Sequence, residues 1–224
     1  MPLRVCLRLF CLIVIFLGLY SLADTISLYQ DAGLSSTLRF RPAASVSADQ
    51  SSMEIENSAA YLRLPEAGLE APVMQGSDNM EYLNKNPQGE FSLSGSLFLD
   101  SRNSPDFSDS YSLIYGHHME HWLMFGALDH YLEDDFFAAN PYGALTVKGT
   151  EYRLDIFAVL ECSAYEDIVF NPPESTQLLT FIRSHAKYQR EAEDTGRILG
   201  MSTCQYPDTR ARTVVFAMIH QEGE

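Results

Sequence analysis

The sequence is poor in basic residues and in cysteine, and each shortage argues against a class of protein. Its 224 residues include 15 Lys and Arg against 30 Asp and Glu, which gives a formal net charge of -15 at pH 7. So acidic a surface repels phosphates, and we therefore expect no nucleic-acid partner. The four cysteines are too few for a disulfide framework, because Cys6 and Cys11 lie in an apolar N-terminal run. A single bridge between Cys162 and Cys204 stays open at this point.

Charge is also missing from one long run near the N-terminus. Arg4 and Arg8 precede the uncharged stretch LFCLIVIFLGLYSL, Leu9 to Leu22. Basic residues before an apolar run stay on the cytoplasmic side, so the rest of the chain is expected to be exported. The run is intermediate in length between a signal peptide and a full span, and Ser21 to Ala23 resembles a cleavage site. We favour an uncleaved, single-pass anchor over residues 1–23, because the flanking apolar residues lengthen the span.

Beyond the anchor, the sequence predicts a linker and one domain, without internal repeats. Residues 24–58 have no strong period and are rich in Ser and Ala, which is typical of a stalk. Residues 59–224 contain two segments of helical periodicity, from His121 and from Glu174. They also contain eight β-rich runs between turn signals: AYLRL, EAPVM, GSLFLD, YSLIYG, GALTVK, EYRLDIFAVL, RILGMSTC and RTVVFAMI. Since exposed edges are a liability, this pattern favours a mainly β fold, a closed eight-stranded barrel with a few peripheral helices.

Three residues that are far apart in the sequence carry groups suited to nucleophilic catalysis. Cys204 ends one β-rich run, His117 follows another, and Arg212 opens the last. A thiolate can attack a carbonyl, an imidazole can exchange the proton, and a guanidinium can stabilise the developing oxyanion. A lone cysteine is more often a small buried hydrophobe, so the residues alone leave both readings of Cys204 open.

The order of the motifs resembles that of the class B sortases, cysteine transpeptidases that attach surface proteins to the Gram-positive cell wall. The resemblance covers residues 60–220 and rests on APVMQGSDNMEYL, GSLFLDSRN, LIYGHHM, MFGALDHYLEDDFF, STC and RTVVFAMI. It implies that Cys204 is the nucleophile, His117 the general acid and base, and Arg212 the group that stabilises the substrate carbonyl. Arg210 and His118 are the competing residues for the last two roles.

The resemblance also implies a reaction and its partners. Cys204 would cleave a sorting signal after threonine and form a thioester, and an amine of a peptidoglycan precursor or of a pilin would then accept the surface protein. Ser202, Thr203 and Ile182 are the expected substrate contacts, the last from the helix after Glu174 that helps to form the groove. The enzyme would act on the outer face of the cell membrane, and neither a cofactor nor a metal is implied.

Three other interpretations stay open on the sequence. The cluster HHMEH places His117, Glu120 and His121 close enough in sequence to share a metal, although it lacks the HExxH order. A non-catalytic, membrane-tethered binding module would also fit the composition. A secreted cysteine peptidase fits less well, because such enzymes usually place the cysteine before the histidine.

Overall fold

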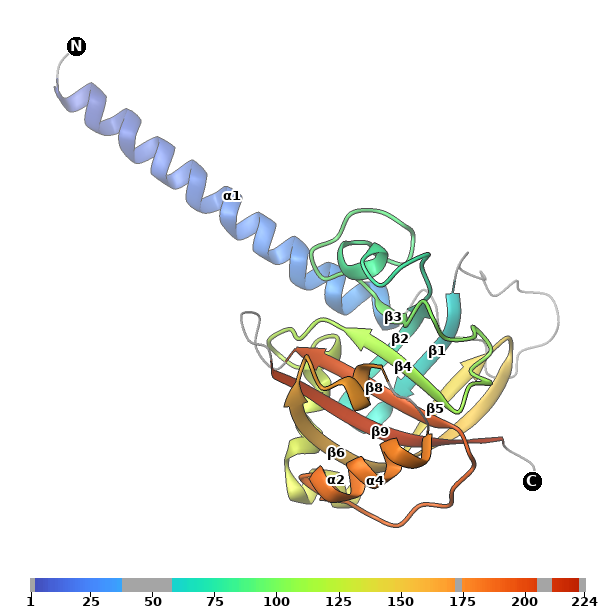
Figure 1. Cartoon of the computed structure of the whole chain (residues 1–224). Coiled ribbons are helices and arrows are strands. Elements are labelled where there is room, and N and C mark those ends of the chain that lie inside the picture. Colours follow the sequence, from blue (N-terminus) through green and yellow to red (C-terminus); the bar gives the residue numbers. More distant parts are fainter. Residues whose placement is uncertain (1–2, 38–57, 172–174, 205–210, 222–224) are drawn as a thin grey trace.

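The structure is a computed structural model that describes residues 3–37, 58–171, 175–204 and 211–221 (Figure 1). Its strands in these ranges are β1 (Ser58–Leu64), β2 (Leu69–Met74), β3 (Leu97–Leu99), β4 (Tyr111–Gly116), β5 (Tyr142–Val147), β6 (Thr150–Ser163), β7 (Tyr188–Gln189), β8 (Ile198–Cys204) and β9 (Ala211–Gln221). They pair in the order β5-β1-β2-β3-β4-β8-β9-β6-β7, and β5 also pairs with β6. This last pairing closes eight strands into a barrel and confirms the predicted fold class.

Short helices cover the connections between the strands. They are the 3-10 helices η1 (Pro65–Ala67), η2 (Glu81–Asn84) and η3 (Phe125–Leu132), and the α-helices α2 (Asp134–Ala139), α3 (Asp167–Phe170) and α4 (Ser175–His185). The helix predicted from Glu174 is α4. The one predicted from His121 begins later, because His121, Trp122 and Met124 have φ values of 60°, 62° and 50°, which no right-handed helix accommodates.

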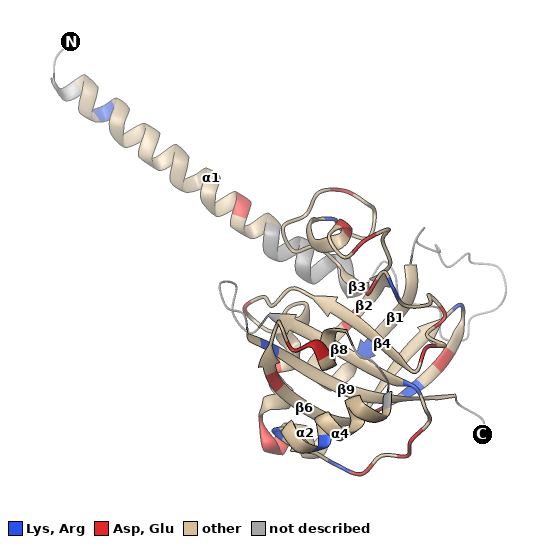
Figure 2. Ribbon diagram, viewed as in Figure 1, with Lys and Arg blue, Asp and Glu red and all other residues tan. Residues whose placement is uncertain are grey.

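A long N-terminal helix, α1 (Leu3–Thr37), projects from the barrel (Figure 1). Its segment Val5–Ser27 has 23 residues with a mean hydropathy of 2.4, long and apolar enough to cross a membrane. Figure 2 shows few charged residues on the coloured part of α1, whereas acidic residues are spread over the barrel and its connections. The helix continues into the expected stalk, and residues 38–57 of that stalk lie outside the described residues. The division at residues 23 and 58 stays a prediction.

The core has two layers that share the barrel wall. Along β9, Val215, Ala217 and Ile219 point into the barrel cluster, while Val214, Phe216 and Met218 join a second cluster on the outside. This period of two explains why RTVVFAMI is apolar throughout, since both faces of β9 are covered. The second cluster contains side chains from α4, β6 and β9.

Ile182 belongs to this outer cluster, and its position corrects one expectation from the sequence. Its side chain has 0% of its surface exposed, on the face of α4 that packs against the barrel. An isoleucine without exposed surface cannot contact a bound peptide in this arrangement. Ile182 therefore stabilises the packing of α4 and is not a substrate contact.

Candidate active site

Strand pairing brings the three predicted catalytic positions to one end of the barrel. Strands β4 and β8 are parallel, and their register runs to the pair Gly116 and Thr203, so His117 and Cys204 come next on adjacent strands. Strand β9 is antiparallel to β8, and Arg212 is the direct partner of Cys204. Neighbouring strands lie about 4.8 Å apart, so the three backbones are neighbours. The structure describes the backbone of Cys204 but not its side chain, and Arg210 lies outside the described residues.

A cavity of about 320 Å³ opens at this end of the barrel. His117 and Arg212 line it, and so do Ser202 and Thr203, two of the expected substrate contacts. The remaining lining residues are Asn79, Leu83, Phe98, Tyr115, Gly116, Ala164 and Phe170. Four of the six site residues named from the sequence therefore border one space, although they come from three different strand ends.

A backbone carbonyl orients the imidazole of His117. Its Nε2 lies 2.7 Å from the carbonyl oxygen of Leu83, at the end of η2. A carbonyl only accepts hydrogen bonds, so Nε2 carries the proton and donates, which leaves Nδ1 to exchange a proton with a thiol or an amine. The sequence carries no sign of this contact, because every residue has a backbone carbonyl.

Arg212 lies between two cysteine positions in the sheet. It pairs with Cys204 on β8 and with Cys162 on β6, and its Nη1 donates to the Ala211 carbonyl (3.0 Å). The two cysteine backbones are thus separated by a strand, about 10 Å from two strand spacings, whereas a disulfide requires less than about 7 Å. Cys162 is accordingly a free cysteine, and the bridge left open by the sequence is not formed.

Burial makes Cys162 a poor nucleophile. It raises the pKa of the Cys162 thiol to about 12, with a further rise from Glu166 and a smaller opposing effect from Arg212. At neutral pH this thiol is therefore protonated. Cys162 is therefore not a candidate nucleophile, and Cys204 on β8 stays the predicted one.

Behind the cavity wall lies a polar network that was not predicted from the sequence. Asp100, with 2% of its surface exposed, accepts hydrogen bonds from the Tyr115 hydroxyl, the Asn79 amide and the guanidinium of Arg102. Burial alone would raise the pKa of Asp100, but the bonds from Arg102 and Tyr115 outweigh it and lower that pKa. The polar run DSRN directly after β3 was the available signal in the sequence.

The competing histidine is engaged elsewhere, since His118 Nε2 lies 2.7 Å from Asp129 Oδ2 and the residue is half-buried. Within the part of the chain that the structure describes, no group of three or more His, Cys, Asp or Glu is placed to hold a metal ion.

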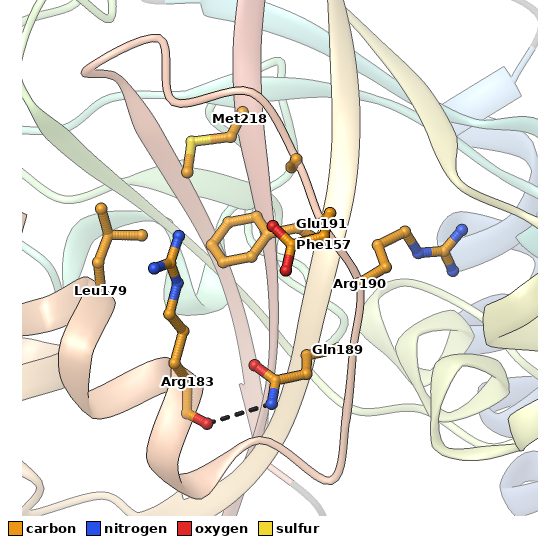
Figure 3. A pocket seen from close by; sticks show the side chains of 8 residues that line it. Phe157, Leu179, Arg183, Gln189, Arg190, Glu191 and Met218 are labelled. Atoms are coloured by element: carbon orange, nitrogen blue, oxygen red, sulfur yellow. Dashed lines mark hydrogen bonds between the residues drawn. The ribbon is translucent and has the colours of Figure 1, made fainter.

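A second cavity, of about 470 Å³, lies between α4 and the segment that follows β7 (Figure 3). Its apolar lining includes Phe157, Leu179 and Met218, and the charged Arg183 and Glu191 also line it (Figure 3). None of the residues named from the sequence as catalytic is among those that line it. Of these two cavities, the smaller one at the strand ends is therefore the candidate active site, because it combines an imidazole with a strand-end cysteine position.

Comparisons with known proteins agree with this arrangement. Residues 62–220 match the family described as "Sortase domain". The chain is 34% identical over 152 residues to Sortase B of Listeria monocytogenes, which covers 64% of this chain and 61% of that relative, less than two thirds of its length.

Two solved structures are similar along most of their length. One is a Streptococcus pyogenes class B sortase involved in pilus biogenesis, with 34% identity, a TM-score of 0.68 and coverage of 74% of this chain and 93% of that one. The other is a Staphylococcus aureus sortase B-substrate complex, with 27% identity, a TM-score of 0.69 and coverage of 75% and 81%.

Proposed function

This chain belongs to the sortase family, with class B sortases as its relatives, and we propose from that premise that it is a membrane-anchored cysteine transpeptidase acting on surface proteins. The observation that carries the proposal is the meeting of β4, β8 and β9, which sets His117 and Arg212 on one cavity at the strand end that carries Cys204. The similarity to a sortase B-substrate complex supports a peptide sorting signal as the substrate.

In the first half of the proposed reaction the enzyme becomes acylated. The imidazole of His117 takes the thiol proton of Cys204, and the sulfur attacks the carbonyl carbon of the threonine in the sorting signal. The guanidinium of Arg212 stabilises the oxyanion. The carbon–nitrogen bond then breaks, and the imidazole of His117 gives a proton to the departing amine. The products are a thioester on Cys204 and the released C-terminal part of the substrate.

In the second half an amine resolves the thioester. The amine of a peptidoglycan precursor attacks the thioester carbonyl, His117 takes up the amine proton, and the sulfur of Cys204 leaves. A new amide bond then joins the surface protein to the cell wall. Transfer prevails over hydrolysis to the extent that the cavity excludes water from the acyl-enzyme.

The N-terminal helix supplies the proposed location. With Arg4 and Arg8 on the cytoplasmic side, the apolar residues that follow Arg8 within the candidate span Val5–Ser27 cross the membrane once, and residues 59–224 form the extracellular catalytic domain. Residues 24–58 then form the connection between membrane and domain. The substrates of the enzyme are then surface proteins held at the same membrane.

Pilus assembly is the second candidate, because one structural relative is a class B sortase involved in pilus biogenesis. The two candidates share the acylation step and differ only in the amine that resolves the thioester, an amine of a wall precursor or of a pilin.

One experiment tests the proposal. The full-length protein in detergent is incubated with a library of sorting peptides and with both classes of amine, beside the variant Cys204→Ala. We expect the wild type to form a thioester, visible by mass spectrometry, and an amide product, and the variant to form neither. Turnover by Cys204→Ala would refute the mechanism, and the preferred amine separates wall anchoring from pilus assembly.

A further inference from the structure

One buried carboxylate joins two segments that border the candidate active site. Asp100 directly follows β3, and its Oδ2 accepts hydrogen bonds from the Tyr115 hydroxyl (3.0 Å) and from the Asn79 side-chain amide (3.0 Å). Tyr115, on β4, and Asn79, in the connection after β2, both line the cavity. Because a buried carboxylate needs such partners, the two side chains are held where they can reach it.

Arg102 extends this network to a third segment. Its Nε and Nη2 donate to the two oxygens of Asp100, at 2.9 and 2.7 Å. The same guanidinium donates through Nη1 to the Asn171 side chain and through Nη2 to the Phe170 carbonyl (2.7 Å). Phe170 is the last residue of α3, where the carbonyls have no partner within the helix. Arg102 therefore ties the end of α3 to the buried carboxylate.

The hydrogen bonds from Arg102 to the end of α3 matter for the site, because Phe170 also lines the cavity. Its ring stacks on that of Tyr115, with 6.4 Å between the centroids and 15° between the planes. Asn79, Tyr115 and Phe170 thus come from three separate segments, and all three depend on the same two residues.

Neither Asp100 nor Arg102 is among the residues that line the cavity. We propose that Asp100 and Arg102 form a positioning pair that sets the spacing of the cavity walls and thereby the fit of the sorting peptide. This inference rests on the proposed function, since it assigns the pair to substrate binding in that same site.

The geometry requires a guanidinium at position 102, and a positive charge alone does not satisfy it. The Arg102 side chain is 57% exposed, so its charge attraction to Asp100 is weakened by water. The planar fork, in contrast, makes two bonds to the carboxylate while its other donors reach α3. A lysine has a single nitrogen and cannot span both partners. Arg102→Lys therefore keeps the charge and removes the tie.

The chain offers a matched control on β6. Arg153 forms the same fork with an aspartate two residues away, through Nε to Asp155 Oδ1 (2.7 Å) and Nη2 to Oδ2 (3.1 Å). Its side chain is 48% exposed, and neither Arg153 nor Asp155 lines the cavity. Arg153→Lys makes the same chemical change away from the site.

The test compares the full-length wild type, Arg102→Lys and Arg153→Lys in detergent. For Arg102→Lys we expect the KM for the sorting peptide to rise roughly tenfold at nearly unchanged kcat, the pattern of lost substrate positioning. Alkylation of Cys204 by iodoacetamide should keep its rate, because this small reagent does not need the cavity walls. Hydrogen exchange of the Phe170 and Asn171 amides should become faster. Arg153→Lys should match the wild type in all three measurements.

Two outcomes overturn the inference: an Arg102→Lys enzyme with the KM of Arg153→Lys, or one that loses kcat and Cys204 alkylation together, which indicates general damage to the fold. Failure of the proposed function has a different signature, because the wild type itself would then form no thioester. The exchange rates at Phe170 and Asn171 would still report on the tie in that case.

Discussion

Replacing Gly95 by alanine should impair catalysis by displacing the carbonyl that orients His117. Gly95 has a φ of +59°, and a Cβ placed there would lie 2.4 Å from the Leu83 carbonyl oxygen and 2.8 Å from that of Tyr82. Carbon–oxygen contacts below 3.0 Å essentially do not occur, so the Leu83 carbonyl must move by the difference between 2.4 and 3.0 Å, about 0.6 Å. The same oxygen accepts the 2.7 Å hydrogen bond from His117 Nε2.

Gly95→Ala should have two separate effects, a loss of folding stability and a loss of kcat/KM. The left-handed backbone costs an alanine about 1–2 kcal/mol of folding stability, and relieving the clash costs about 1–3 kcal/mol more. A misplacement of about 1 Å near reacting groups can lower a rate about a hundredfold, so a shift of about half that size should lower kcat/KM about tenfold. Tenfold corresponds to about 1.4 kcal/mol of transition-state stabilisation.

Gly89→Ala separates the stability cost of a left-handed backbone from the catalytic effect of a displaced carbonyl. Gly89 also has a positive φ, +82°, but a Cβ there meets nothing within 4 Å. We expect both variants to lose stability in urea unfolding, Gly95→Ala by the larger amount, and only Gly95→Ala to lose peptide kcat/KM. If Gly95→Ala keeps the kcat/KM of Gly89→Ala, the Leu83 carbonyl does not position the catalytic imidazole.

Three further predictions concern single side chains. Arg212→Ala should lose most transpeptidation while its melting temperature stays close to that of the wild type, since Arg212 lines the cavity outside the core clusters; a fully active variant would transfer the oxyanion role to Arg210. With a pKa of about 12, Cys162 should be thiolate in only about one molecule in ten thousand at pH 8. Iodoacetamide should therefore leave Cys162 unmodified in folded Cys204→Ala, and modification at the rate of an unfolded control, read by peptide mass spectrometry, would contradict this. The pKa of Asp100 is lowered from its ordinary value of 3.8, so its contribution to stability is complete above that value and is lost as the pH falls through the folded pKa. Asp100→Asn should accordingly show a shallower loss of urea stability between pH about 5 and pH about 2 than the wild type, and equal slopes would argue against the pairing of Asp100 with Arg102.

Much of the fold could be predicted because its signals are local. Each of the eight β-rich runs became a strand of the barrel, since alternation along a strand and turn residues at its ends act over a few neighbouring residues. The apolar run after Arg8 became part of a long helix for the same reason. The helix expected from His121 failed where three positive φ values, imposed by the connection that follows His117, overrode a helical pattern of apolar residues.

From the sequence, only the types of the candidate site residues and their order along the chain could be predicted. The sequence by itself determined that a thiol, an imidazole and a guanidinium end or begin three β-rich runs. That these runs are adjacent was decided by the tertiary structure, through the parallel pairing of β4 with β8 and the placement of β9 between β8 and β6. The pairing of β4 with β8 joins segments more than eighty residues apart, from Tyr111 to Ile198, and no local pattern encodes its register.

The tertiary structure also decided which groups support the site. The helical pattern of α4 does not tell which of its side chains contact a substrate. Packing against the barrel buries Leu178 and Ile182. The Leu83 carbonyl orients His117 although leucine itself has no polar side chain. Residue types and short periods are properties of the chain, whereas burial and the direction of a backbone carbonyl exist only after distant segments have packed together.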